Sequence, residues 1–334
     1  MKILRTAPCF AVLVASLMAS ADAHASSVTF GTGINQFAME FVQIGNPGNA
    51  ADATGNPNPA GSVAYGYNIG KYEVSRDMVT KASSEGALGI TLADMSLYGG
   101  NGIDRPATGV NWNEAARFAN WLNTSQGYSP AYKFGTQPGD VGYSASQNIS
   151  LWVSGDAGFN SSNPFRNSLA RYFLPSVDEW YKAAYYDPNA SGGAGGYWNY
   201  PTGSDTAPTA VAGGTAASTA IYKQPVNQGP NDVNQAGGLS PYGAMGLGGN
   251  VYEWQETEYD LVNNSGGGAR INRGGSWSAL AFNLSASDRA GANPTDENQG
   301  TGFRVASVPE PSGAVLAGLG IFTLIAGQLR RRHR

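Results

Sequence analysis

Thiol and imidazole groups lie only at the two ends of this chain. Its 334 residues include one cysteine, Cys9, and two histidines, His24 and His333. These groups are the usual nucleophiles, general bases and transition-metal ligands of enzymes. The long stretch between them therefore offers no thiolate nucleophile, no Ser/His/Asp triad, no Cys/His zinc site, and no haem or iron held by histidine.

A second set of residues indicates binding. From Trp277 to Phe303 the chain is poor in charge and rich in Ser, Ala and Asn, and the candidate ligand-binding residues in this stretch are Trp277, Ser278, Phe282, Asn283, Asp288, Arg289 and Asn293. An aromatic ring beside amides and hydroxyls suits sugars or extended peptides. The alternative is that Trp277 and Arg289 belong to the structural scaffold, because buried aromatics are usually packing residues. A nearby acidic run, Glu256, Glu258 and Asp260, is expected to be a solvated face and not a set of ligands.

Two helices are expected to position these residues. Asn111 begins the first helix as its N-cap, and Glu114 completes a capping box. Ser176 and Glu179 repeat this arrangement in the second. Trp112 and Trp180 fall on the apolar faces of these helices, where core packing is the expected role.

Short strands and loops make up the rest of the chain. Alternation of apolar and polar residues predicts strands at 28–44, 63–72, 251–254, 270–277 and 302–306. Residues 189–220 are rich in Gly, Ala, Thr and Ser but include the aromatics of Tyr197–Tyr200, so we expect an irregular segment packed on the surface. Few helices among many short strands predict a single α+β domain.

The N-terminal residues predict a signal peptide. Lys2 and Arg5 precede an apolar run, and Ala23-His24-Ala25 has the small-x-small pattern of a cleavage site. Residues 1–25 are therefore expected to direct export through the Sec machinery and to be removed after Ala25. A buried first helix is the alternative.

The C-terminal residues predict a membrane-spanning helix. Residues 312–329 are almost wholly apolar and would span about 27 Å as a helix. The basic residues of 330–334 would stay on the cytoplasmic side under the positive-inside rule. The chain upstream of this helix would then be exported and held at the membrane.

The triplet Pro309-Glu310-Pro311, within 308–311, precedes that helix. Triplet, helix and basic tail together resemble the PEP-CTERM sorting signal of Gram-negative bacteria with extracellular polysaccharide. The resemblance implies cleavage by an exosortase and delivery from the inner membrane to the cell surface. A plain single-span anchor is the alternative.

Residues 26–307 form a net anion, because six of the 20 basic residues of the chain lie in the two end segments. A net anion lacks the basic surface that binds nucleic acid or an anionic membrane. With no cysteine, the domain also has no disulfide to stabilise it.

This domain contains a series of short motifs, which are G-K-Y-E-V from Gly70, the two capped helices, G-N-V-Y-E-W from Gly249, R-G-G-S-W from Arg273 and G-F-R from Gly302. In this order they resemble the motifs of the formylglycine-generating enzyme (sulfatase-modifying factor) family. The resemblance implies a variant of the C-type lectin fold, low in regular structure and ordered partly by calcium. In that fold the stretch after Trp277 borders the ligand groove.

The catalytic residues of that family are missing. Its enzymes hold copper(I) with two cysteines, and the resemblance places Ala279 and Leu284 at those positions. A second branch holds iron with histidines, which the domain also lacks. We therefore expect no copper, iron, zinc or haem, and a domain without catalysis.

Calcium is the one metal that the resemblance allows. The family binds it through carbonyls at the positions of Gly249 and Val251, the carboxylate of Glu253, and an upstream Asn or Asp that is Gly246 here. The ligands are oxygens, as calcium prefers, but one is lost, so a weakened site is expected. In the alternative, Glu253 caps the turn or pairs with an arginine.

Two functions remain open from the sequence. The first is a non-catalytic binding or structural module at the surface of a Gram-negative bacterium, with extracellular polysaccharide or a surface protein as its partner. The second is an enzyme, either a divergent formylglycine-generating oxidase or a new activity in the same groove.

Overall fold

The computed structural model describes residues 26–309. The expected signal peptide, with Ala23 and Ala25, lies outside the described residues. So do Glu310, Pro311, the apolar stretch 312–329 and the basic tail. Within residues 26–309, no helix is both long enough and apolar enough to cross a membrane.

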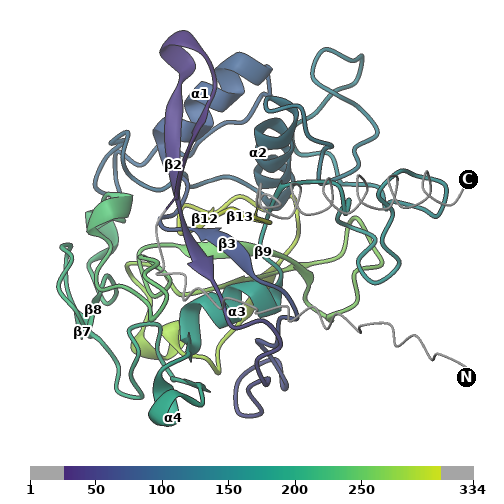
Figure 1. Ribbon diagram of the computed structural model, residues 1–334. Helices are drawn as coiled ribbons and strands as arrows, with labels where there is room; N and C mark the ends of the chain where they lie inside the picture. Colours follow the sequence, from purple (N-terminus) through teal and green to yellow (C-terminus); the bar gives the residue numbers. More distant parts are fainter. Residues whose placement is uncertain (1–25, 310–334) are drawn as a thin grey trace, which may run out of the picture.

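Two β-sheets form the centre of the domain (Figure 1). The first has five strands in the order β1 (Ser26–Phe30), β2 (Phe37–Ile44), β3 (Tyr67–Gly70), β13 (Ala306–Ser307) and β4 (Tyr172–Phe173). The second has four strands in the order β11 (Ala290–Ala292), β10 (Arg270–Arg273), β9 (Tyr252–Glu258) and β12 (Thr301–Phe303). All neighbours pair antiparallel except β12 and β9, which are parallel.

Three helices of more than one turn pack on these sheets, with α1 (Arg76–Gly86) and α2 (Trp112–Thr124) on one side of the central strands and α3 (Val177–Tyr185) on the other in the view of Figure 1. Both predicted capping boxes are confirmed, at Asn111 and Glu114 for α2 and at Ser176 and Glu179 for α3. The sequence analysis missed α1. Its cap, Ser75, is followed at the third position by Met78 and not by an acidic residue, and only Val79 and Ala82 are buried on its inner face.

The core confirms the packing role of both helical tryptophans. Trp112 and Trp180 have no exposed surface. The Trp112 indole nitrogen donates to the carbonyl of Gln255 at 2.8 Å, which ties α2 to the middle of β9. The two sheets and the few helices described above confirm the prediction of a mixed α+β fold.

Residues 189–220 are irregular, as expected. They contain the one-turn helix α4 (Ala190–Gly193) and three two-residue strands. β6 (Gly196–Tyr197) pairs with β5 (Tyr186–Asp187), which precedes the segment, and β7 (Thr209–Ala210) pairs with β8 (Thr219–Ala220). Tyr197 packs against the rings of Tyr181 and Tyr186 at 5.7 and 5.1 Å. The segment is thus fixed on the domain by its aromatic residues.

Two predictions about the second sheet are wrong. The strand expected at 270–277 ends at Arg273, because Gly274 and Gly275 follow with φ values of 96° and 76°, outside the range of a strand. The acidic run is not a solvated face, since β9 continues to Glu258 and both Glu256 and Glu258 are buried.

The buried carboxylate of Glu256 is stabilised by hydrogen bonds to its oxygens. It accepts hydrogen bonds from the hydroxyl of Tyr132, the amide of Asn163 and the guanidinium of Arg166. Arg166 also forms a two-pronged pair with Glu179 of α3. Asp260 alone of the run is exposed.

Candidate ligand-binding site

The G-N-V-Y-E-W turn leads into a buried ion pair. Glu253 and Arg304 both have fully buried side chains. Glu253 Oε2 accepts from Arg304 Nε and from the Trp180 indole nitrogen, both at 2.6 Å, and Glu253 Oε1 accepts from Arg304 Nη2. Both oxygens of this carboxylate are therefore bonded to nitrogen donors.

Glu73 lies beside this pair as a second buried carboxylate. Its Oε2 accepts from the Asn250 amide at 2.8 Å, whereas its Oε1 has no partner among the described residues. Burial, followed by the negative charge of Glu253, raises the pKa of Glu73 well above its usual value. The guanidinium of Arg304 is bonded to Glu253 and to backbone carbonyls and not to Glu73, so the cluster favours a proton on Glu73.

This geometry does not fit a calcium ion held by Glu253. A ligand carboxylate needs free oxygen lone pairs, and the Glu253 oxygens are taken by Arg304 and Trp180. Gly246 adds no side-chain oxygen, and the residues that the structure describes contain no group of three or more His, Cys, Asp or Glu arranged for a metal. The arrangement at Gly249, Val251 and Glu253 favours the alternative, in which Glu253 pairs with an arginine.

The copper positions are also filled by packing. Leu284, on the short 3₁₀ helix Ala281–Leu284, is buried and clusters with Ala220 and Tyr222. Ala279 contributes a backbone hydrogen bond, in which its carbonyl accepts from Lys223 N at 2.9 Å. Neither side chain has a donor atom for copper, so these two positions supply no copper ligand.

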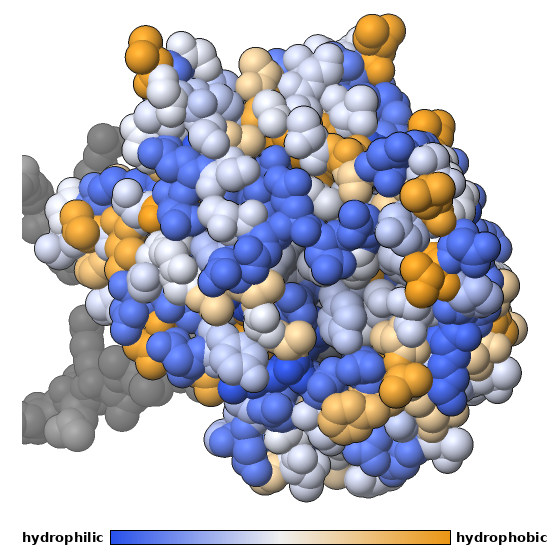
Figure 2. All heavy atoms as spheres, turned by 180° about the vertical axis from the view of Figure 1, so that it is seen from behind, coloured by the Kyte–Doolittle hydropathy of each residue, from blue (hydrophilic) through white to orange (hydrophobic). Residues whose placement is uncertain are grey.

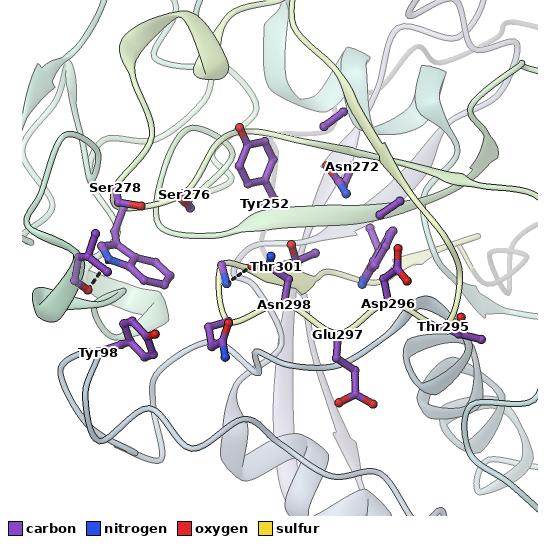
Figure 3. Close-up of a pocket in the computed structure, with 17 residues that line it drawn as sticks. Tyr98, Tyr252, Asn272, Ser276, Ser278, Thr295, Asp296, Glu297, Asn298 and Thr301 are labelled. Carbon is purple, nitrogen blue, oxygen red and sulfur yellow. Dashed lines mark hydrogen bonds between the residues drawn. The ribbon is translucent and has the colours of Figure 1, made fainter.

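A cavity of about 970 Å³ lies over the second sheet (Figure 3). Residues of β9, β10, β11 and β12 line it, including Tyr252, Asn272 and Ala292. The loop 295–300 lines another side, and Tyr98, Val226 and Ser278 lie at one end. The cavity is thus built by side chains from four strands and from separate loops.

The cavity lining is mostly polar and uncharged. Seven of its 17 residues are Asn, Gln, Ser or Thr, and four are aromatic. Tyr98 and Tyr252 are half-buried, so part of each is exposed. Figure 2, which views the molecule from behind, shows a largely hydrophilic face with scattered apolar residues. The cavity offers aromatic faces beside many hydrogen-bonding groups.

Two of the seven predicted binding residues, Trp277 and Ser278, line this cavity. Trp277 is only 3% exposed, and its indole nitrogen donates to the carbonyl of Val226 at 3.1 Å. Its ring lies 6.3 Å from that of Tyr98. Trp277 therefore fixes the cavity wall by packing, while Tyr98 and Tyr252 present the more accessible rings.

The other five residues lie outside the cavity. Phe282 is 60% exposed on the short helix 281–284. Asn283 donates to Asp288 at 3.2 Å, and Asn293 bonds through its backbone to Asp296. Arg289 donates to Asn56 Oδ1 and to the carbonyl of Tyr259, which is a scaffold role.

The sequence analysis missed most of the cavity. Tyr98 comes from a loop about 180 residues before Trp277, and no sequence signal links the two. A signal did exist for the loop 295–300, since five polar residues in a row precede the G-F-R motif.

The acidic loop of the cavity is coupled to the start of α2. Glu297 Oε1 lies 3.4 Å from the amide of Asn111, the N-cap of that helix. Glu114, the other half of the capping box, is buried. Burial, assisted by the negative charge of Glu297, raises the pKa of Glu114 to about 7.

Known proteins share the motifs and the fold of this domain. The pattern of the sulfatase-modifying factor enzyme 1-like domain matches residues 34–308. The chain belongs to this family. A comparison with curated proteins finds no match.

Among solved structures, the sulfatase-modifying factor-like domain is similar to "Treponema denticola variable protein 1", at 21% identity and a TM-score of 0.57, covering 85% of this chain and 99% of that one. It is also similar to CarF, at 17% identity and a TM-score of 0.55, covering 81% of this chain and 99% of that one. At these identities the likeness establishes the fold alone.

We predict that Arg304→Met lowers the free energy of unfolding of this sulfatase-modifying factor-like domain by about 3–5 kcal/mol, because Glu253 then stays buried without its cation. Lys81→Met removes a cation from the surface pair with Asp77 and should cost less than about 1 kcal/mol. Urea unfolding measures both changes. EGTA should leave the melting temperature unchanged, and a calcium-dependent rise that Glu253→Gln abolishes would contradict the ion-pair assignment.

The raised pKa of Glu114 predicts a pH dependence of stability. Between the usual glutamate pKa of 4.5 and the raised value of about 7, the folded state binds more protons at this site than the unfolded state does. The stability from this group is therefore complete below pH 4.5 and is lost as pH rises through 7, by up to roughly 3 kcal/mol. Glu114→Gln should flatten that decline in urea unfolding measured at several pH values, and an unaltered slope would refute the assignment.

Proposed function

We propose that this protein is an exported cell-surface binding protein whose sulfatase-modifying factor-like domain is not catalytic. Its ligand, an extracellular polysaccharide, binds in the cavity over the second sheet. The supporting observation is the composition of that cavity, in which the half-buried rings of Tyr98 and Tyr252 lie among uncharged hydrogen-bonding side chains. This combination suits sugars, whose rings have apolar faces and whose edges have hydroxyls.

The absence of thiols and imidazoles from the domain sequence supports a function without catalysis. The family positions for copper ligands hold Ala279 and Leu284, and Leu284 is packed in a hydrophobic cluster. Soft thiolates are the ligands that select copper(I), and neither an alanine nor a leucine side chain replaces them.

The proposed location rests on the two ends of the sequence. Removal of residues 1–25 after Sec export would leave a precursor held in the inner membrane by 312–329. An exosortase would then recognise Pro309-Glu310-Pro311 and pass the protein to the surface of a Gram-negative cell. A surface protein is the other partner that the exported location allows.

Tyr98→Ala tests the binding site. It should weaken binding to exopolysaccharide isolated from the producing bacterium about three- to tenfold, because one aromatic face is lost. The matched control is Leu97→Ala, since Leu97 is 75% exposed on the same loop and does not line the cavity. Calorimetric titration measures both affinities, and equal affinities for the two variants would exclude this cavity.

The competing function is an oxidase that takes its metal ligands from a partner. Incubation with copper and a peptide of the form C-x-P-x-R distinguishes it, with aldehyde formation followed by mass spectrometry. The proposal requires no aldehyde above the control without protein. A signal above that control would replace the binding function by an enzymatic one.

Sorting has its own test. Replacement of Pro309-Glu310-Pro311 by three alanines should leave the protein in the inner membrane, as followed by cell fractionation and immunoblotting. The matched control replaces Val262-Asn263-Asn264 of a surface loop by three alanines. A triplet variant that still reaches the surface would leave only a plain membrane anchor.

A further inference from the structure

The charged side chains that line the cavity over the second sheet are all negative. Asp296 and Glu297 line it, and of the described residues that do so, none is a lysine or an arginine. Arg289 is close in sequence, but its guanidinium is bonded to Asn56 and to the carbonyl of Tyr259. The lining of the cavity therefore carries two carboxylates and no lysine or arginine.

These carboxylates are not neutralised within the domain. No ion pair found among residues 26–309 involves Asp296 or Glu297. Asp296 Oδ2 accepts one bond, from the backbone of Asn293 at 2.9 Å, and Glu297 Oε1 accepts one long bond from Asn111. In Figure 3, Asp296 turns toward the strands that hold Tyr252 and Asn272, whereas Glu297 turns away from them.

A third carboxylate, that of Asp288, lies outside the cavity lining but acts electrostatically on Tyr252. Burial, and then the charge of Asp288, raises the pKa of Tyr252 to about 12. Tyr252 thus remains a neutral phenol beside the acidic loop. A cation would be favoured at this position, and an acidic ligand would be repelled.

The floor of the cavity favours a saccharide over an extended peptide. Tyr252 and Asn272 belong to β9 and β10, the two inner strands of the sheet, whose backbone groups are already paired with neighbours on both sides. A peptide therefore has no free strand edge to join on this floor, which lies between the outer strands β11 and β12. Recognition must use side chains, which are mainly hydroxyls, amides and tyrosine rings.

We propose that the cavity binds an amine-bearing saccharide, with the protonated amine facing Asp296 and a sugar ring facing Tyr98 or Tyr252. This inference rests on the proposed function of the cavity as a ligand site. It narrows the ligand to cationic polymers such as those rich in unacetylated hexosamine, and it excludes acidic polysaccharides.

A matched pair of probes tests the charge. The full-length chain is titrated calorimetrically with glucosamine hexamer and with N-acetylglucosamine hexamer, at a pH where the free amines are protonated. The first should bind at least tenfold more tightly. Its affinity should also fall steeply between 0.05 and 0.5 M salt, because the screening length is only about 10 Å at 0.1 M.

Matched variants locate the effect. Asp296→Asn combined with Glu297→Gln should reduce glucosamine-hexamer affinity tenfold or more and leave the weak acetylated-probe affinity unchanged. Asp104→Asn is the control, because Asp104 is exposed, does not line the cavity, and has no side-chain hydrogen bond among the described residues. Thermal unfolding of each variant confirms that the fold is retained.

The outcomes separate this inference from the proposed function. Equal binding of the two probes, unaffected by the double variant, overturns the charge inference. Failure of both probes, together with Tyr98-dependent binding of the native exopolysaccharide, also overturns the inference while keeping the binding function. Tight binding of a lysine-rich peptide in place of either sugar overturns the saccharide class.

Discussion

The whole domain depends on one buried guanidinium. Arg304 pairs with Glu253 of β9, donates to the carbonyl of Gly70 at the end of β3, and donates to the carbonyl of Met245 in the preceding loop. One side chain thereby joins both sheets and the turn that precedes β9. A buried charge is tolerated only when its partners are complete, and here every donor group of Arg304 is bonded. The relative placement of the two sheets follows from this constraint.

The same constraint builds the cavity. Arg304 directly follows β12, so fixing it also fixes β12 beside β9. The loop 295–300 leads into β12 and is held by the bond from Tyr252 N to the carbonyl of Gly300 at 2.8 Å. The second sheet and its buried ion pair thus hold the side chains that line the cavity. The residues that would contact a ligand contribute little to this framework.

The sequence predicted the frame better than the site. The capping boxes of α2 and α3 and the burial of Trp112 and Trp180 depend on neighbours within one turn, and local patterns reveal them. The cavity depends on contacts between distant segments, such as Tyr98 with Trp277, which no local pattern encodes. Glu256 shows the same limit. Acidic residues at 256, 258 and 260 indicate a solvated face, and no local pattern reveals that Arg166, Tyr132 and Asn163 converge on the first of them. Trp277 was predicted to bind ligand because it is aromatic. It is buried in the cavity wall, and Tyr98 and Tyr252 have the more accessible rings.

The final short strand has a consequence for how the domain is made. β13 pairs with β3 on one side and with β4 on the other, so residues 306–307 complete a sheet whose other strands end by residue 173. During synthesis from the N-terminus, β3 and β4 cannot be joined in the sheet until β13, which lies between them, has been made. Such distant pairings slow folding, since the intervening loop must close before the contacts form. The first sheet is therefore completed late, when synthesis of the domain is nearly finished, and its exposed edges would need protection until then.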